Sequence, residues 1–276
     1  MRVPTPFIRS IVGCGTFLIP LWSIAATADE STRAGGSDRQ ILRRDDATGY
    51  EFWWYAPEPT GPTKNVSVDD DVEAAGSADE PSRIPLILFL HGGGESGGDP
   101  RRILGLGLPK LIEAGRNYPA FVASPHNPGE TKFWDDVRLV KLVDSLTRQH
   151  PIDHRRIYLT GLSRGGYGAW RAAIQNPNLF AAVVPIAGGG NPPYGFRLTS
   201  LPIWAFHGDA DRDIPAEESQ RMVDATNRAG GQAKLTLYPG VGHDSWSQTY
   251  ERDDLWRWLF DQRRTDRDQA GKVIEP

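Results

Sequence analysis

Cysteine is almost absent from this chain of 276 residues: the single example is Cys14, close to the N-terminus. The long region after it can therefore form no internal disulfide and offers no thiol nucleophile. Positive charge is not in excess either, because the formal net charge is −4. This balance argues against a surface that attracts nucleic acid. Apolar residues make up 39% of the chain and aromatic residues 10%, which is ordinary for a globular protein with one large core.

One long apolar run, residues 11–26, follows two arginines and ends in small residues. This order is typical of a signal peptide, so we expect one over residues 1–28, with cleavage after Ala28. The run is shorter than the roughly 20 residues of a membrane-spanning helix, and Pro20 interrupts it. Lipid attachment at Cys14 is the less favoured alternative, because the apolar stretch lies after that residue. Cleavage removes two positive charges, which leaves a secreted or periplasmic chain with a net charge of −6 and no stable membrane span.

The remainder divides into a flexible polar lead-in over 29–48, one domain over 49–260 and a charged tail over 261–276. Inside the domain, residues 57–83 are rich in Pro, Gly, Ser and acidic residues. They show no apolar periodicity, which predicts a long solvated loop. Three successive aspartates in this loop lack the alternating spacing and closing glutamate of a calcium-binding loop.

Short apolar runs alternate with amphipathic stretches through the domain. After a first strand near 50–55, the runs predict strands over 86–90, 120–124, 157–160, 182–186, 203–206 and 235–238. The stretches predict helices over 135–148, 166–176, 216–229 and 248–260, with these residues facing the core: Val137, Val140, Val143 and Leu146, and later Leu255, Trp258 and Leu259. Such alternation indicates an α/β fold with a mostly parallel central sheet flanked by helices. The segment 188–200 is too short for a large lid domain.

Residues 157–166 read IYLTGLSRGG, which is a strand, a G-x-S-x-G pentapeptide and the start of a helix. This arrangement is typical of a nucleophile elbow, where a sharp turn lifts Ser163 above the sheet. Glycines are needed there because neighbouring backbone crowds the turn. The alternative is a serine that caps a helix. The pentapeptide is weak evidence alone, but its place between strand and helix favours Ser163 as a catalytic nucleophile.

A serine nucleophile needs a histidine base and a carboxylate that orients the histidine. Both follow Ser163 in the order serine, acid, histidine. The strand at 203–206 leads into three candidate acids: Asp209, Asp211 and Asp213. The strand at 235–238 leads into His243, at the same carboxyl edge of the sheet. The other histidines fit the role of base less well. His91 and His207 close strands, and His126 precedes the serine in the chain. His150 and His154 lie near a helix end.

Four segments together resemble the bacterial esterase and predicted-peptidase branch of the α/β-hydrolase superfamily, close to phospholipase/carboxylesterases and feruloyl-esterase-like enzymes. They are LILFLHGGGESGG, RIYLTGLSRGGYGAW, WAFHGDADRDIP and YPGVGHDSW, and the resemblance covers about residues 50–260. It implies an α/β-hydrolase fold and a serine hydrolase that cleaves carboxylic esters through an acyl-enzyme. The family's H-G-x-x-D run selects Asp211 over its two neighbours, which gives a triad of Ser163, Asp211 and His243.

The resemblance also suggests an oxyanion hole made by two backbone N–H groups, from Arg164 and from Gly93, with Gly94 as an alternative to Gly93. We expect Trp134 and Trp246, on loops at the same edge, either to pack in the protein or to line a substrate site. The family needs no metal and no organic cofactor.

The run GGGESG, residues 92–97, matches a dinucleotide fingerprint, but Gly98, Asp99 and Pro100 follow where a helix should start. A nucleotide cofactor is therefore not expected, and the resemblance implies a small-molecule or carbohydrate-linked ester as the substrate. A serine peptidase and a non-catalytic binding protein of the same fold remain as alternatives.

Overall fold

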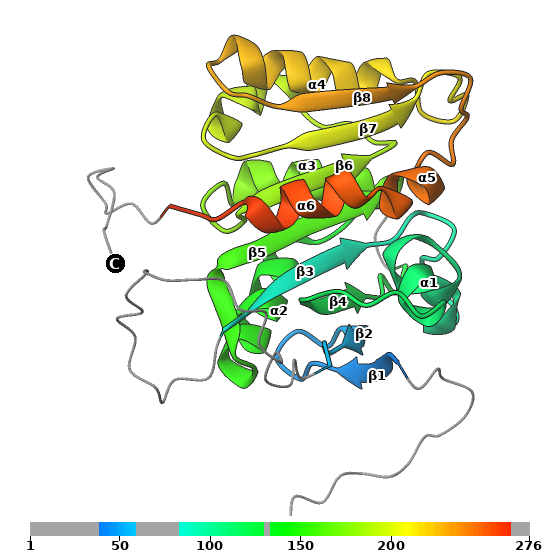
Figure 1. The fold of residues 1–276 in the computed structure, drawn as a ribbon, viewed down its shortest axis with the longest axis vertical. Coiled ribbons are helices and arrows are strands. Elements are labelled where there is room, and N and C mark those ends of the chain that lie inside the picture. The colour runs from blue at the N-terminus through cyan, green and yellow to red at the C-terminus, as the bar shows by residue number, and fades with distance from the viewer. Residues whose placement is uncertain (1–38, 59–82, 130–132, 266–276) are drawn as a thin grey trace, which may run out of the picture. The chain divides into compact units, whose positions relative to one another are not determined.

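The computed structural model describes residues 39–58, 83–129 and 133–265, and a β-sheet forms the centre of this part of the chain. The predicted signal peptide, most of the acidic loop and most of the charged tail lie outside the described residues. The described residues form eight strands in the order β1-β2-β4-β3-β5-β6-β7-β8 (Figure 1). Their bounds are Ile41–Arg44, Glu51–Tyr55, Ile84–Leu90, Phe121–Pro125, Ile152–Leu162, Ala182–Ile186, Trp204–Gly208 and Lys234–Tyr238 for β1 to β8.

Strands β3 to β8 run parallel, whereas β2 pairs antiparallel with β4 and β1 antiparallel with β2. The predicted mostly parallel sheet is confirmed. Since β3 is buried on both faces, its side chains alternate between two apolar cores: Leu86, Leu88 and Leu90 on one side, Ile87 and Phe89 on the other.

Helices cover both faces of the sheet (Figure 1). One core includes side chains of α2 Asp136–Gln149, α3 Arg164–Gln175 and α4 Glu217–Arg228. The opposite core includes side chains of α1 Gly107–Glu113, α5 Trp246–Glu251 and α6 Asp253–Asp261. Two 3₁₀ helices, η1 Pro100–Gly105 and η2 Pro192–Leu198, lie in the connections. In the described part of the chain no large lid domain is present, and no helix has the length and hydropathy needed to cross a membrane.

The prediction of a flexible lead-in was wrong for Ile41–Arg44, which form strand β1. All four residues are exposed, so they carry no alternation that the sequence could reveal. Pairing with β2 at the edge of the sheet makes them a strand. Helix α1 and both 3₁₀ helices were not predicted either, because each is only six or seven residues long.

The last predicted helix, 248–260, is two helices. Arg252 lies between them with extended backbone angles, φ −71° and ψ 119°, and its guanidinium binds Asp254. The predicted inward face is confirmed in outline: Leu255 and Leu259 are buried, and Trp258 is partly buried against the same core. Trp256, which was not predicted to face inward, is buried as well. On α2 the side chain of Val137 is 59% exposed, because the buried face begins at Leu139.

Candidate active site

Ser163 stands on a strained turn between β5 and α3. Its backbone angles are φ 54° and ψ −118°, a left-handed φ that is costly for a residue with a side chain. Its N–H donates to the carbonyl of Ile186 at the end of β6, 2.9 Å away, which holds the turn against the sheet. The sequence produces this conformation through its two flanking glycines. A Cβ on Gly161 would lie 2.3 Å from the Gly165 carbonyl oxygen, and one on Gly165 would lie 2.0 Å from the Leu90 carbonyl oxygen.

The loops after β7 and β8 are tied together by backbone hydrogen bonds. The N–H of Asp209 donates to the Tyr238 carbonyl at 3.1 Å, and the N–H of Ala210 donates to the Val241 carbonyl at 3.0 Å. Because β7 and β8 are parallel neighbours, their carboxyl ends lie side by side, and these bonds fix the two loops in register. The loop after β7 carries Asp211, and the loop after β8 carries His243.

The structure brings the three predicted triad residues together. The Nε2 atom of His243 is 2.9 Å from the Oγ atom of Ser163, and its Nδ1 atom is 2.7 Å from Oδ2 of Asp211. With a proton on Nδ1, His243 donates to the carboxylate and accepts from the serine hydroxyl. The Asp211 side chain is fully buried and that of His243 is 22% exposed, so the histidine faces the solvent side of the site.

The Asp211 carboxylate is held in its ionised form. Burial acts to raise the pKa of Asp211, but the N–H of Ile214, the His243 ring and the N–H of Asp213 outweigh it, so the pKa is below its usual value. Both N–H groups bind Oδ1, at 3.0 and 2.9 Å. The carboxylate therefore remains charged at neutral pH and can stabilise a protonated His243.

The other two candidate acids lie outside this chain of hydrogen bonds. Asp209 is exposed, and its carboxylate accepts from the Gly240 N–H at 2.7 Å. Asp213 is also exposed, although it has a carboxylate oxygen within 4.8 Å of Asp211 and His243, as in a small metal site. Asp211 and His243 already bind each other through Oδ2 and Nδ1, an arrangement that suits proton transfer.

The histidines at strand ends have separate roles. His91 accepts from the backbone N–H of Asn127 through Nε2, at 3.0 Å, and so connects the loops after β3 and β4. Burial lowers the pKa of His91 to about 4, which keeps its ring neutral at pH 7. His207, at the end of β7, contacts Asp211 directly, a contact that was not predicted. The H-G-x-x-D spacing, which puts these residues four apart at a strand end, was the available signal.

The residues expected to form the oxyanion hole lie beside Ser163. Arg164 is the first residue of α3, and an N–H at that position has no acceptor within the helix. On the loop after β3, a Cβ on Gly92 would lie 3.6 Å from the Ser163 Cβ atom. Gly93 lies under the Arg164 guanidinium, because a Cβ there would lie 2.9 to 3.2 Å from three of its atoms. A Cβ on Gly94 would meet no atom within 4 Å, so the space beside Gly94 is the most open of the three glycines.

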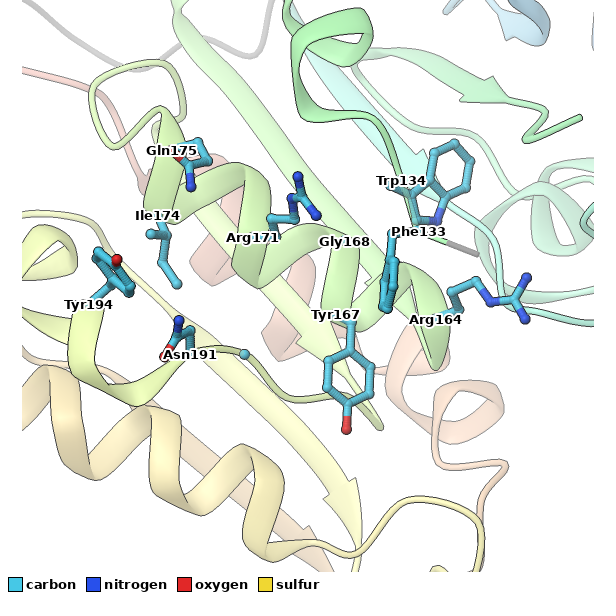
Figure 2. Close-up of a pocket in the computed structure, with 11 residues that line it drawn as sticks. Phe133, Trp134, Arg164, Tyr167, Gly168, Arg171, Ile174, Gln175, Asn191 and Tyr194 are labelled. Carbon is cyan, nitrogen blue, oxygen red and sulfur yellow. The ribbon is translucent and has the colours of Figure 1, made fainter. Parts of the chain in front are cut away.

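The two tryptophans differ in exposure. Trp134 is 2% exposed, its indole N–H donates to the His91 carbonyl at 3.3 Å, and its ring packs on Gly168. These contacts bury the ring in the protein, and Trp134 also lines a cavity along α3 (Figure 2), so its position fits both interpretations. Trp246 is partly exposed and meets the His243 ring edge to face, with 5.1 Å between centroids.

A cavity of about 370 Å³ runs along the outer side of α3 from Arg164 to Gln175 (Figure 2). Helix α3 supplies Tyr167 and Arg171, and the chain before α2 supplies Phe133. On the other side, Asn191 and Tyr194 come from η2 and the residue before it. Asn191 and Tyr194 were not predicted as site residues, because they are polar or exposed residues without a motif.

The comparisons with known proteins agree with this geometry. The model of the dienelactone hydrolase family matches residues 126–254, the segment that carries Ser163, Asp211 and His243. NocK of Nocardia uniformis subsp. tsuyamanensis, whose name proposes an esterase, is 32% identical over 148 residues, which are 48% of this chain and 41% of that protein. This chain therefore spans about two fifths of that relative's length.

Among solved structures, a thermostable esterase is 29% identical with a TM-score of 0.63, covering 82% of this chain and 63% of that one. The acylaminoacyl peptidase of Pyrococcus horikoshii is 15% identical with a TM-score of 0.56, covering 83% of this chain and 42% of that one, and shows the fold alone. The chain therefore has the α/β-hydrolase fold, and it is similar to esterases and, over residues 126–254, to the dienelactone hydrolase family.

Proposed function

We propose that this protein is a serine hydrolase that cleaves carboxylic esters through an acyl-enzyme. One observation carries the proposal: the continuous hydrogen-bond chain from Ser163 through His243 to Asp211, with the serine on a strained elbow. Similarity to esterases supports an ester as the substrate. The peptidase alternative uses the same residues and has support at the level of fold only.

In the proposed reaction, His243 takes the proton of the Ser163 hydroxyl through Nε2 while Oγ attacks the ester carbonyl. The resulting oxyanion accepts hydrogen bonds from the backbone N–H groups of Gly93 and Arg164. His243 then gives its proton to the departing alcohol, which leaves an acyl group on Ser163. A water molecule, activated by the same histidine, releases the acid and restores the serine.

We place the rest of the substrate in the cavity along α3. Its walls offer exposed aromatic rings, Phe133 and Tyr194, together with the amides of Asn191 and Gln175. Rings and amides of this kind suit a planar or sugar group attached to the ester. Trp246, beside His243, is the second proposed contact. We also propose that the protein is secreted or periplasmic after cleavage behind Ala28, which a mature N-terminus at Asp29 would support.

A fluorophosphonate probe tests the proposal directly, because it reacts with an activated serine and not with an ordinary hydroxyl. We expect one adduct per folded molecule, on Ser163, and none in the Ser163→Ala variant. A folded wild-type protein without an adduct would exclude the serine hydrolase and favour the binding-protein alternative. A panel of p-nitrophenyl esters, aminoacyl amides, and feruloylated and acetylated sugars then separates esterase from peptidase activity.

A further inference from the structure

His207 is a fully buried histidine that touches the triad but lies outside its path of proton transfer. It closes β7, and its side chain has no exposed surface. Its Nε2 atom is 3.2 Å from Oδ2 of Asp211 and 2.9 Å from the carbonyl oxygen of Ile214. Its Nδ1 atom is 2.8 Å from Oγ of Ser219, on α4. Both ring nitrogens thus have partners inside the protein.

These partners determine where the protons are. A carboxylate and a carbonyl oxygen only accept hydrogen bonds, so Nε2 carries a proton. The Ser219 hydroxyl has one proton, and it donates that proton to the carbonyl of Gly188 at 2.7 Å. The serine oxygen then faces Nδ1 as an acceptor, and Nδ1 carries a proton as well. If Nδ1 carried no proton, the single proton of Ser219 would have to serve both Nδ1 and the Gly188 carbonyl. One of these two contacts would then bring two acceptor atoms together without a proton between them.

We propose that His207 is a buried imidazolium that positions the Asp211 carboxylate and offsets part of its charge. This inference rests on the proposed function, since it concerns the acid of the proposed triad. The site would then be a chain of four groups, Ser163, His243, Asp211 and His207. In this chain Oδ2 of Asp211 accepts from both histidines.

The charges around His207 are consistent with a single ion pair. Asp211 is the ionisable side chain in direct contact with it in the described part of the chain. On α4, Glu218 precedes Ser219, but its carboxylate is bonded to Arg221. Tyr167 of α3 lies near Glu218, since a Cβ on Gly189 would contact both side chains. Tyr167 adds no charge at neutral pH, because burial raises the pKa of its hydroxyl above the usual value. The buried cation therefore has its counter-charge in Asp211, and the remaining Asp211 oxygen is bound by two backbone N–H groups.

A cation in this place would affect catalysis through His243. Each time His243 takes the proton of Ser163, a second positive charge forms beside the same carboxylate oxygen. The His207 charge opposes this step and also opposes protonation of His243 by solvent.

Two variants separate the charge from the hydrogen bond. His207→Gln keeps an N–H that can reach Asp211 but removes the charge, whereas His207→Leu removes both. We expect His207→Gln to move the acid limb of the pH profile of kcat/KM upward by about one to two pH units. His207→Leu should add a fall in kcat of roughly tenfold or more through loss of a hydrogen bond to a charged group, with KM little changed because His207 does not face the cavity.

Nuclear magnetic resonance of the wild-type protein with isotope-labelled histidine gives a readout independent of activity. At pH 7 we expect proton signals on both nitrogens of the His207 ring, absent from the His207→Gln spectrum. If that variant does not fold, Ser219→Ala assigns the ring instead by shifting its Nδ1 signal. A single protonated nitrogen, or an acid limb that His207→Gln leaves in place, would overturn the inference. If the folded wild-type protein were not labelled by the fluorophosphonate, the proposed function would be overturned instead. The protonation state of His207 measured by magnetic resonance would still stand.

Discussion

Replacement of Asp211 by asparagine tests whether the carboxylate orients the base. The four donors around the carboxylate point two at each oxygen: the N–H groups of residues 213 and 214 at Oδ1, and the rings of His207 and His243 at Oδ2. An amide can accept on one side only. With its oxygen toward the backbone, its NH₂ group faces His243 and forces the proton of that ring from Nδ1 to Nε2. His243 then donates to Ser163 and cannot take its proton.

We expect Asp211→Asn to lower kcat/KM by a factor of about 10⁴, the usual cost of the wrong histidine tautomer in such a triad. This corresponds to about 5 kcal/mol of transition-state stabilisation. The fold should persist with a loss of about 3–5 kcal/mol, because the amide leaves the proposed His207 cation buried without its counter-charge. Steady-state kinetics on a short-chain p-nitrophenyl ester and urea denaturation measure the two effects.

Two matched controls come from the same loop. Asp209→Asn and Asp213→Asn change exposed carboxylates outside the hydrogen-bond chain, so each should leave kcat/KM within about threefold of the wild type. An Asp211→Asn variant that keeps more than about a tenth of the activity, or a control that loses as much as Asp211→Asn, would refute the role of Asp211.

Three further predictions, which use five substitutions, test other parts of the structure. Gly165→Ala places a methyl group 2.0 Å from a backbone oxygen that cannot move away, so it should prevent folding or cost several kcal/mol in a thermal melt, whereas Gly93→Ala displaces only the end of an arginine side chain and should cost less than about 1 kcal/mol. Comparable losses in both variants would contradict this account. Asp153→Asn should lower the free energy of unfolding by about 1–3 kcal/mol at pH 7, because the buried carboxylate binds two arginines. Although burial acts to raise the pKa of Asp153, the hydrogen bonds from Arg156 and from a backbone N–H and the neighbouring arginine charges outweigh it and hold the pKa below its usual value. The stabilisation is therefore complete above about pH 4 and is lost as the pH falls further, so the gap between variant and wild type in denaturation curves should close in acid and not in base. Trp134→Ala should cost about 3–5 kcal/mol as a core truncation, while Trp246→Ala should lower kcat/KM with little effect on stability; unchanged kinetics of Trp246→Ala on every accepted ester would remove Trp246 from the substrate site.

The sequence predicted the parts of the fold whose signals are local. A buried parallel strand is a continuous apolar run, so β3 and β6 were found within two residues of their ends. The nucleophile elbow was predicted correctly because the turn is too crowded for a Cβ at Gly161 and Gly165, and these glycines are visible in the sequence. Strand β1 and helix α1 could not be predicted in the same way. The first depends on a neighbour elsewhere in the chain, and the second is too short to show a helical period.

Within the candidate site, the choice among three aspartates shows where local reasoning ends. Asp209, Asp211 and Asp213 have the same chemistry and lie within five residues of one another, so composition treats them alike. In the structure they differ in what surrounds them. Asp209 is turned toward the loop after β8, Asp213 is exposed, and Asp211 alone of the three lies between two imidazole rings, under two backbone N–H groups. Those surroundings come from β7, β8 and α4 together. The selection of Asp211 is therefore a property of the packed loops, and His207, which a search for a single base sets aside, is part of what makes that position different.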